Sequence, residues 1–472
     1  MTADDAPAAA PARSRSVVTL AVSLVLVELL AGMQRYLSQT VLPLVAADLD
    51  GAHLYGPLDA AAQAPMFLTM PLGAWLLSRF RVGRLLVVLT LVTVAGAVLC
   101  ALAPSMVVFI AGTAVRAAAA GALATVGMGV VARGLPPRHR QLVLAAMSGV
   151  WLVSSVLGPV YAAGVATTLG WRWAMVLYLP VLLVVRLVVA RSAPERPESV
   201  PTEPAPWGWA LVLAAGSAVL ALPVGAWWPL VLPAGAALMV GAAARILPAG
   251  TLRARSGRRA GLTALGVTAA VYFGATMVLS VVAHDALGLG TRDVAVVVAA
   301  PGLLWAAVAL WTGSHPASTD AAFRRRAALA SGSLAAGVLV LLLAVLVAGA
   351  GRAGVLAALV AGGGLLGAGM GTVYPDLLGR CLTPPARDDG ISEDRVAAAV
   401  VLAESVGMAL ATTAAYAWLG GGSALLTEPV DRARVLYAVL LGVAVVVVRR
   451  LLAAARPDVA GTAAGGAGRQ AA

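Results

Sequence analysis

The stretch VELLAGMQRYLSQTVLP (Val27–Pro43) lies inside the first long apolar run of the 472-residue chain, yet it carries the opposite charges Glu28 and Arg35. A charge at the centre of a lone membrane-spanning helix costs about 2.5–3.5 kcal/mol on insertion scales. Glu28, Gly32, Arg35 and Gln39 recur at helical spacing and therefore share one face. The stretch predicts a membrane-spanning helix with a polar face, on which Gly32 allows close approach of a neighbour.

The rest of the chain extends this pattern. It is 61% hydrophobic and only 11% charged, against about 25% charged residues in soluble domains. Apolar runs long enough, or nearly long enough, to cross a bilayer recur fourteen times, near 17–45, 57–78, 85–103, 106–132, 141–168, 173–190, 207–223, 226–244, 261–283, 293–313, 327–349, 353–375, 396–419 and 433–451. The sequence therefore predicts an all-α polytopic membrane protein.

Basic residues set the expected orientation. The chain contains no Lys, so all 33 basic residues are Arg, and most lie in the loops on one side of the predicted spans. Such an excess marks the cytoplasmic side, which predicts a multi-pass plasma-membrane protein with both termini in the cytoplasm. The net charge of +12 is thus explained by the Arg residues that orient the protein in the membrane. We therefore expect no nucleic-acid partner. The loops on the other side hold only Arg172, Arg292, Arg352, Arg432 and Arg434.

The spacing of the runs predicts two six-helix bundles with an inserted two-helix hairpin. Repeated bundles of this kind place a substrate site between them, near the membrane midplane. The acidic loop 384–395 is expected to pair with Arg of another cytoplasmic loop. The expected units are a disordered cytoplasmic tail 1–16, an N-terminal bundle 17–190, a Pro-rich linker 191–206, the hairpin 207–244, a basic loop 245–260, a C-terminal bundle 261–452 and a disordered tail 453–472.

Catalytic and metal chemistry find little support in the sequence. The four His are scattered, the two Cys are predicted to lie at opposite membrane faces, and no metal-ligand spacing occurs. A membrane transferase would need a convergent set of His or acids at one membrane face. A phosphate-binding glycine loop of the kind that binds ATP requires a Lys, and this chain has none. We therefore expect no enzyme, no metal and no cofactor.

Four further motifs stand out in the apolar runs. GAWLLSRFRVGRL (Gly73–Leu85) follows the second run, and VRAAAAGALATVG (Val115–Gly127) lies in the fourth. The fifth contains SSVLGPVYAAG (Ser154–Gly164), followed by WRWAMVLYLP (Trp171–Pro180). Together with fourteen runs, these motifs make nearly the whole chain resemble the major facilitator superfamily, in particular its fourteen-span drug:proton antiporter branch of the multidrug efflux type.

The resemblance implies a gating loop after the second span. The family pattern places a Gly, an Asp and then Gly-Arg there. Gly73, Gly83 and Arg84 fit this pattern, whereas Ser78 stands about where the Asp is expected and the spacing is one residue longer. Because this loop controls the inward–outward switch in the family, its network is expected to be altered here.

The resemblance also implies a proton-coupling Arg in the fourth span and a packing motif in the fifth. Arg116 fills the first role, although Gly121 follows one residue later than in the family pattern; its alternative role is a structural bond to helix carbonyls. Gly158, Pro159 and Gly164 match the antiporter motif, which favours export over uptake. An ordinary proline kink is the alternative reading of Pro159.

The acid that the branch places near Gln34 in the first span is missing. Glu28, Asp59 and Glu404 are the candidates to replace it as proton carrier, because intramembrane ionisable groups are functional by default. The alternative for Glu28 and Arg35 is a buried structural network. Asp376, at the inner edge of its span, is expected to form a gate or helix-end contact.

The leading hypothesis is a secondary transporter that exports amphiphilic or cationic small molecules in exchange for protons by alternating access. The alternative is an exporter of an endogenous metabolite or lipid with altered or absent proton coupling, which the missing acids favour. The expected partners are a small-molecule substrate, protons and membrane lipids, with the protein acting as a monomer. The predicted site combines Glu28, Gln34, Arg35, Gln39, Asp59, Arg116 and Glu404.

Overall fold

The computed structural model describes residues 10–134, 137–192, 207–222, 227–347, 351–383, 389–391, 393–421 and 426–456. Within these ranges all regular elements are helical, as the sequence predicts. Residues 193–206 of the predicted linker 191–206, half of the acidic loop and the outer parts of both predicted tails lie outside the described residues.

The long helices follow the predicted apolar runs. The first group comprises α1 (Ala10–Asp48), α2 (Tyr55–Arg79), α3 (Val82–Ala101), α4 (Met106–Gly134), α5 (Pro137–Thr168), the short α6 (Trp171–Ala174) and α7 (Leu179–Ser192). α8 (Trp207–Leu220) and α9 (Trp228–Ile246) follow. The second group comprises α10 (Gly257–Thr276), α11 (Leu279–Val281), α12 (Thr291–Ser314), α13 (Asp320–Leu346), α14 (Arg352–Leu382), α15 (Glu393–Leu419) and α16 (Pro429–Ala454). α10 thus begins inside the segment predicted as the basic loop.

Twelve helical stretches among the described residues are long and apolar enough to cross a membrane. α8, with 14 residues, is shorter than this. The prediction of an all-α polytopic membrane protein is therefore confirmed, while the count of fourteen spans and the inserted hairpin stay predictions.

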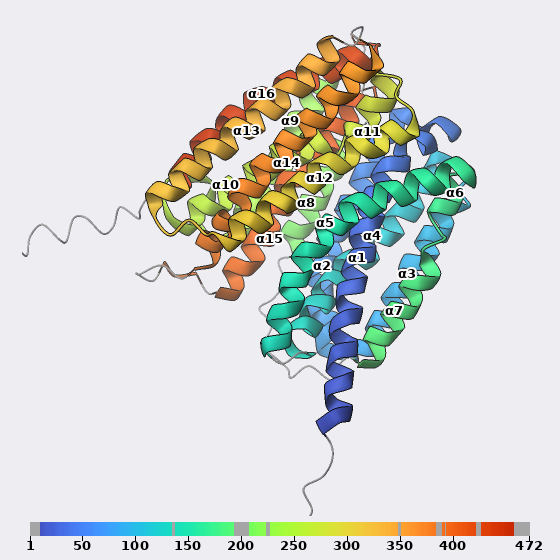
Figure 1. Cartoon of the computed structure of the whole chain (residues 1–472), viewed down its shortest axis with the longest axis vertical. Coiled ribbons are helices and arrows are strands. Elements are labelled where there is room, and N and C mark those ends of the chain that lie inside the picture. The colour runs from blue at the N-terminus through green and yellow to red at the C-terminus, as the bar shows by residue number, and fades with distance from the viewer. Residues whose placement is uncertain are drawn as a thin grey trace, which may run out of the picture.

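The helices pack as two groups side by side (Figure 1). In the first, α1 packs on α5 and α7, and α4 packs on α2 and α3; in the second, α14 packs on α12 and α13, and α10 on α15 and α16. α8 and α9 pack on each other and lie against α2 and α15. The groups touch mainly through α5 with α12 and α2 with α15.

Small residues let these helices approach closely. A Cβ added at Gly32 of α1 would lie 2.7 Å from the Cβ of Ser154 on α5, which confirms the predicted close approach. In the second group, a Cβ at Gly337 would lie 2.8 Å from the carbonyl oxygen of Gly362. Membrane helices associate largely through such packing, because lipid is as apolar as their side chains.

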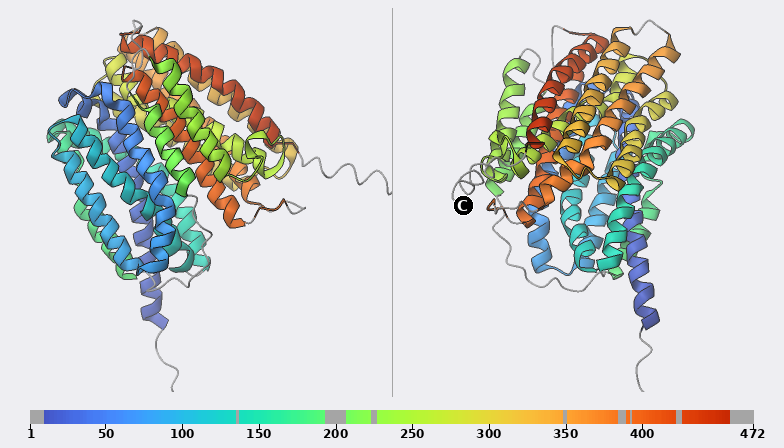
Figure 2. Two further views of the ribbon diagram at one scale, coloured as in Figure 1. Left: turned by 180° about the vertical axis from the view of Figure 1, so that it is seen from behind. Right: turned by 60° about the vertical axis from the view of Figure 1, so that its left-hand side comes forward.

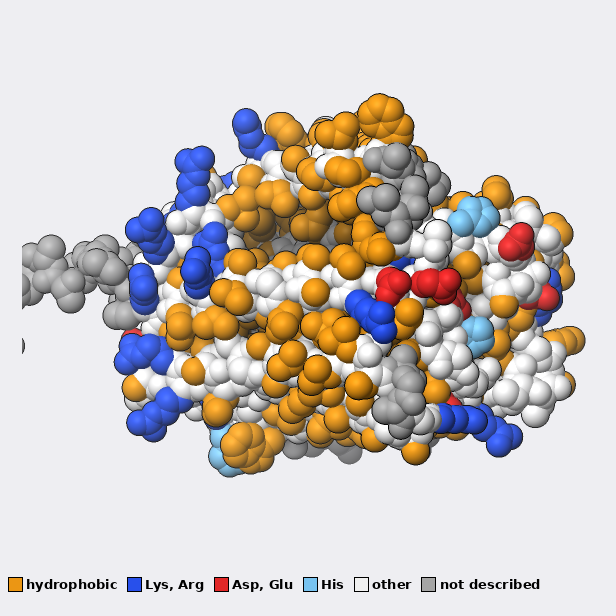
Figure 3. All heavy atoms as spheres, turned by 90° about the horizontal axis from the view of Figure 1, so that it is seen from above, with side chains coloured by type: hydrophobic (Ala, Val, Ile, Leu, Met, Phe, Trp, Pro, Cys, Tyr) orange, Lys and Arg blue, Asp and Glu red, His pale blue; other side chains and the backbone are white. Residues whose placement is uncertain are grey.

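The two groups meet at one end and diverge toward the other, at which α1 begins (Figure 2). The first end holds the 3₁₀ turn η1 (Ala52–Leu54) and the π-helix η4 (Val282–Ala286), and we call it the η1 end. We call the opposite one the Arg-rich end, since exposed Arg84, Arg191 and Arg449 lie there. Figure 3 shows basic side chains gathered at one end, with apolar side chains over the face beside them.

Candidate functional site

The polar face of α1 divides between two environments. Glu28 and Gln34 line a cavity inside the first helix group, whereas Arg35 and Gln39 reach residues of the second group. α1 lies at the boundary between the groups and spans nearly the whole depth of the molecule. The predicted polar face of α1 therefore serves two adjacent polar sites.

The first of these sites is a cavity of about 390 Å³ between α1, α3, α4 and α7, within the size range of small-molecule pockets. Glu28 accepts a hydrogen bond from the indole Nε1 of Trp151 at 3.2 Å. Arg116 lines the same wall, and the side-chain oxygen of Gln34, in the amide orientation that satisfies both groups, accepts from its Nε at 3.1 Å and from its Nη2. The cavity thus collects three predicted site residues: Glu28, Gln34 and Arg116.

Arg186 is a fourth charged group in this cavity. Its position near the end of the apolar run 173–190 favours a place at the cytoplasmic end of that span. In the structure α7 continues to Ser192, about 1.7 turns beyond Arg186, and Arg186 lines the cavity. The available signal was an Arg inside an apolar run, a feature that Arg186 shares with Arg116.

The second site lies where the two helix groups meet. The amide of Gln39 donates to the carbonyl oxygens of Thr276 at 2.6 Å and Met277 at 3.1 Å on the other group. Arg35 donates to the sulfur of Met408 at 3.0 Å and stacks 5.0 Å from the ring centroid of Phe273. The guanidinium of Arg35 thus contacts a sulfur and an aromatic face, and it has no carboxylate partner among the described residues.

Two acids complete this second site. Asp59 Oδ2 accepts from the hydroxyls of Thr413 at 2.7 Å and Thr412 at 2.9 Å, both on α15. Glu404, also on α15, accepts from the hydroxyl of Tyr374 at 2.9 Å. The ring of Tyr374 in turn packs on Trp305, which contacts Phe273 beneath Arg35. Asp59 therefore bridges the helix groups, whereas Glu404 bonds within one of them.

A further bridge closes the η1 end. The hydroxyl of Tyr55 on α2 donates to Asp285 of the π-helix η4 at 2.7 Å. Tyr55 is buried and packs on Tyr416 of α15, whose hydroxyl donates to the Met277 carbonyl. Together with Asp59, this contact ties α2 to the second group at the end where the groups converge.

The antiporter motif packs α5 against α1. A Cβ at Gly158 would lie 2.6 Å from the Cβ of Tyr36 and 3.0 Å from the Met33 carbonyl oxygen, so only glycine fits there. Pro159 is buried within α5. A Cβ at Gly164 would meet nothing within 4 Å, and this position is exposed. Close packing in this motif therefore rests on Gly158.

The predicted gating loop joins α2 to α3. A Cβ at Gly83 would lie 2.5 Å from the Ala190 carbonyl oxygen, which lets α3 start close against α7, and Arg84 is exposed. Gly73 and Ser78 lie in α2, and the side chain of Ser78 lies outside what the structure describes.

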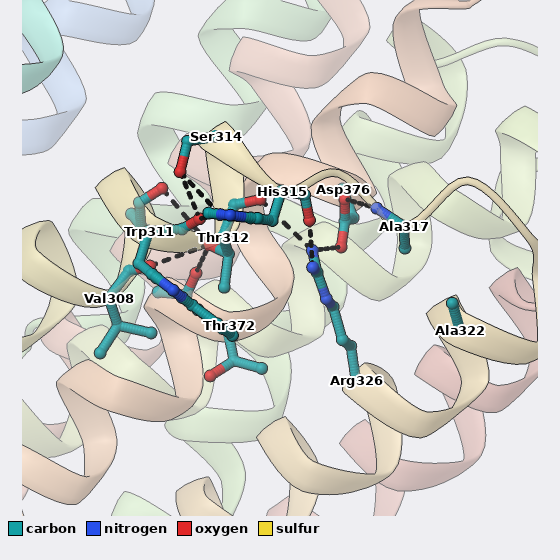
Figure 4. A network of polar contacts seen from close by, with 12 residues as sticks. Val308, Trp311, Thr312, Ser314, His315, Ala317, Ala322, Arg326, Thr372 and Asp376 are labelled. Atoms are coloured by element: carbon teal, nitrogen blue, oxygen red, sulfur yellow. Dashed lines mark hydrogen bonds and ion pairs between the residues drawn. The ribbon is translucent and has the colours of Figure 1, made fainter.

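The second group carries a charge network at its own Arg-rich end, shown in Figure 4. Arg326, in the first turns of α13, donates to Asp376 of α14 at 2.6 Å and also to the carbonyl of His315. The other oxygen of Asp376 accepts from the amide of Ala317 at 3.0 Å. Asp376 thus fixes the α12–α13 turn, which is the helix-end contact predicted for it.

The acidic loop also pairs as predicted. Asp389 lies 3.5 Å from the guanidinium of Arg258 at the start of α10, and its carbonyl accepts from Arg259 at 3.0 Å.

Comparison with known proteins agrees with this architecture. The family model described as Major Facilitator Superfamily matches residues 24–412. The chain belongs to the major facilitator superfamily. The resemblance of its motifs to this superfamily is thereby confirmed.

Curated relatives in this superfamily are efflux pumps. The chain is 23% identical over 195 residues to the multidrug export protein EmrB of Haemophilus influenzae, covering 41% of this chain and 38% of that protein. It is 22% identical over 179 residues to the multidrug efflux pump SdrM of Staphylococcus aureus, covering 38% and 39%. The matched region thus spans less than half the length of these relatives.

Solved structures share the fold. A bacterial homologue of the human lysosomal transporter Spinster, in an inward-facing and unoccupied conformation, matches with a TM-score of 0.62 and 14% identity over 94% of this chain and 97% of that chain. The human organic anion transporter MFSD10 matches with a TM-score of 0.54 and 16% identity over 93% and 100%.

Proposed function

We propose that this transporter exports amphiphilic small molecules in exchange for protons by alternating access. The observation that carries the proposal is the bridge between Asp59 and the hydroxyls of Thr412 and Thr413, because it joins a titratable group to the contact between the two helix groups. The multidrug efflux pumps among its relatives support export.

In the proposed cycle the groups rock about their contact. Both bridging bonds end on one oxygen of Asp59. A proton on this carboxyl removes the charge that strengthens such bonds, so proton uptake loosens the η1 end. Glu404 and Glu28 are the further proposed proton carriers, and Arg35 and Arg116 are the proposed cations that respond to their charge.

The proposal includes the remaining expectations about topology. The two helix groups are the moving units, 17–190 and 261–452, and α8 with α9 form a hairpin inserted between them, giving fourteen membrane helices. The Arg-rich end faces the cytoplasm of a cell whose plasma membrane holds the protein. The cavity of the first group then lies on the route by which solute leaves the cytoplasm.

The test is proton movement in energised inverted vesicles that contain the protein, followed with a pH-sensitive dye while amphiphilic solutes are added one at a time. Wild type is expected to release protons on addition of a transported solute. Asp59→Asn and Glu404→Gln are expected to lose this release while still inserting in the membrane. Solute movement without proton movement would instead favour the uncoupled exporter, and normal coupling in both variants would refute the assigned carriers.

A further inference from the structure

The cavity between α1, α3, α4 and α7 carries an imbalance of charge. Its polar lining consists of two guanidiniums, Arg116 and Arg186, one carboxylate, Glu28, and neutral side chains. The remaining wall is apolar and includes Leu24, Val27, Leu86, Leu123, Leu182 and Val189. A site of this kind holds an apolar body and orients it by a few polar groups.

Five of the polar side chains have hydrogen-bond partners inside the protein. The Arg116 guanidinium donates to Gln34, and Glu28 accepts from Trp151. The hydroxyls of Thr90 and Thr93, also in the wall, donate to carbonyls of their own helix, those of Leu86 and Leu89. These contacts leave the threonine hydroxyls no proton to offer a ligand.

Arg186 differs from these residues. It makes no hydrogen bond and no ion pair with any residue that the structure describes, and Glu28 lies beyond the 4.0 Å of an ion pair although both line one cavity. A guanidinium presents several N–H donors in a planar fork that matches a carboxylate or similar oxyanion. The charge of Glu28 acts on Arg186 across the cavity, but among the described residues no group accepts a hydrogen bond from its guanidinium. The cavity thus offers free guanidinium donors beside an apolar surface.

We propose that this cavity binds an amphiphile through an anionic oxygen group, a carboxylate or sulfonate, paired with Arg186, with the apolar part of the molecule against Leu24, Val27 and Leu182. The inference rests on the proposed function, since it names the substrate class of that exporter. It makes Arg186 a specificity-determining residue and disfavours a purely cationic substrate, because two guanidiniums face one carboxylate.

The test uses three probes that share one apolar body: 4-(1-pyrenyl)butanoate, the corresponding alcohol and the corresponding amine. Binding to the purified full-length protein in detergent is measured by pyrene fluorescence. Wild type is expected to bind the butanoate at least about tenfold more tightly than the alcohol, and the amine most weakly, because a charge-assisted hydrogen bond contributes more than a neutral one.

Variants separate charge recognition from packing. Arg186→Gln is expected to lose at least about tenfold in butanoate affinity with no change for the alcohol. Arg186→Lys keeps the charge without the fork and is expected to fall between wild type and Arg186→Gln. Arg449→Gln, which removes an exposed Arg at the end of α16, is the matched control. Should Arg186→Gln not fold, the ranking of the three probes by wild type decides the point.

Equal affinity for the three probes, tightest binding of the amine, or an equal loss for butanoate and alcohol in Arg186→Gln would overturn the inference. Binding in detergent requires neither protons nor transport. Anion-selective binding without any export from vesicles would therefore refute the exporter and leave this inference standing. Proton-coupled export of the amine but not the butanoate would support the exporter and refute the anion-binding inference.

Discussion

The strongest prediction concerns Asp59→Ala. This substitution removes both hydrogen bonds between α2 and the two threonine hydroxyls of α15. Hydrogen bonds to a charged group contribute about 1.5–3 kcal/mol each. The freed hydroxyls can bond to carbonyls of their own helix, so we use the low end of that range for each bond.

The two bonds together then stabilise the conformation closed at the η1 end by about 3 kcal/mol, which corresponds to a factor of about 150 in the equilibrium between conformations. An open conformation that wild type populates at about 1% would rise to about 60% in Asp59→Ala. The change is an equilibrium shift and needs no substrate.

The assay is a distance distribution between spin labels at His53 and Thr427, which are exposed positions at the η1 end, one on each side of the contact. The two native cysteines, which are buried and free, are replaced beforehand. We expect a second, longer distance to become the major one in Asp59→Ala. Asp293→Ala is the control, because its ion pair with Arg352 lies within the second group.

An unchanged distribution in Asp59→Ala would refute the reasoning, since it would mean that these bonds do not hold the two groups together. The same long distance in Asp293→Ala would also refute the reasoning. The shift would then not depend on the bonds that Asp59 makes between the two groups.

Three other substitutions test the remaining parts of the site. Gly158→Leu is expected to lower stability by about 1–3 kcal/mol through overpacking against α1, measured as thermal unfolding in detergent, whereas Gly164→Leu, facing open space, should match wild type. Asp376→Asn leaves the part-buried Arg326 without its ion-pair partner; we expect a loss of up to about 3–5 kcal/mol, and a melting temperature equal to that of wild type would count against it. Glu28→Gln is expected to abolish solute export with normal membrane insertion, and full export in vesicles would exclude a coupling role.

The sequence predicts those features that depend on local pattern. Helix positions followed from apolar runs, since a chain in lipid must satisfy its backbone polar groups internally. The close approach at Gly32 and the helix-end role of Asp376 followed from small-residue spacing and from position at the end of a run. The pairing of the acidic loop followed from its charge alone.

Contacts between distant segments required the tertiary structure. Helical spacing put Glu28 and Arg35 on one face of α1, but it carries no information about which helix lies beside each turn. Trp151 donates a hydrogen bond to Glu28, whereas Arg35 donates to the sulfur of Met408. One polar face of α1 therefore contributes to two sites. The bridge from Asp59 joins residues more than 350 positions apart, and no local pattern encodes such a pair.

The sequence by itself thus determined that this protein is a helical membrane protein and which intramembrane charges need an explanation, because hydrophobic length and the cost of buried charge act locally along the chain. Only the tertiary structure decided which neutral groups those charges bond to, that Arg186 lines a cavity, and that Asp59 joins the two helix groups. Those outcomes depend on how the helices pack, and side-chain contacts across that packing are set by geometry in three dimensions.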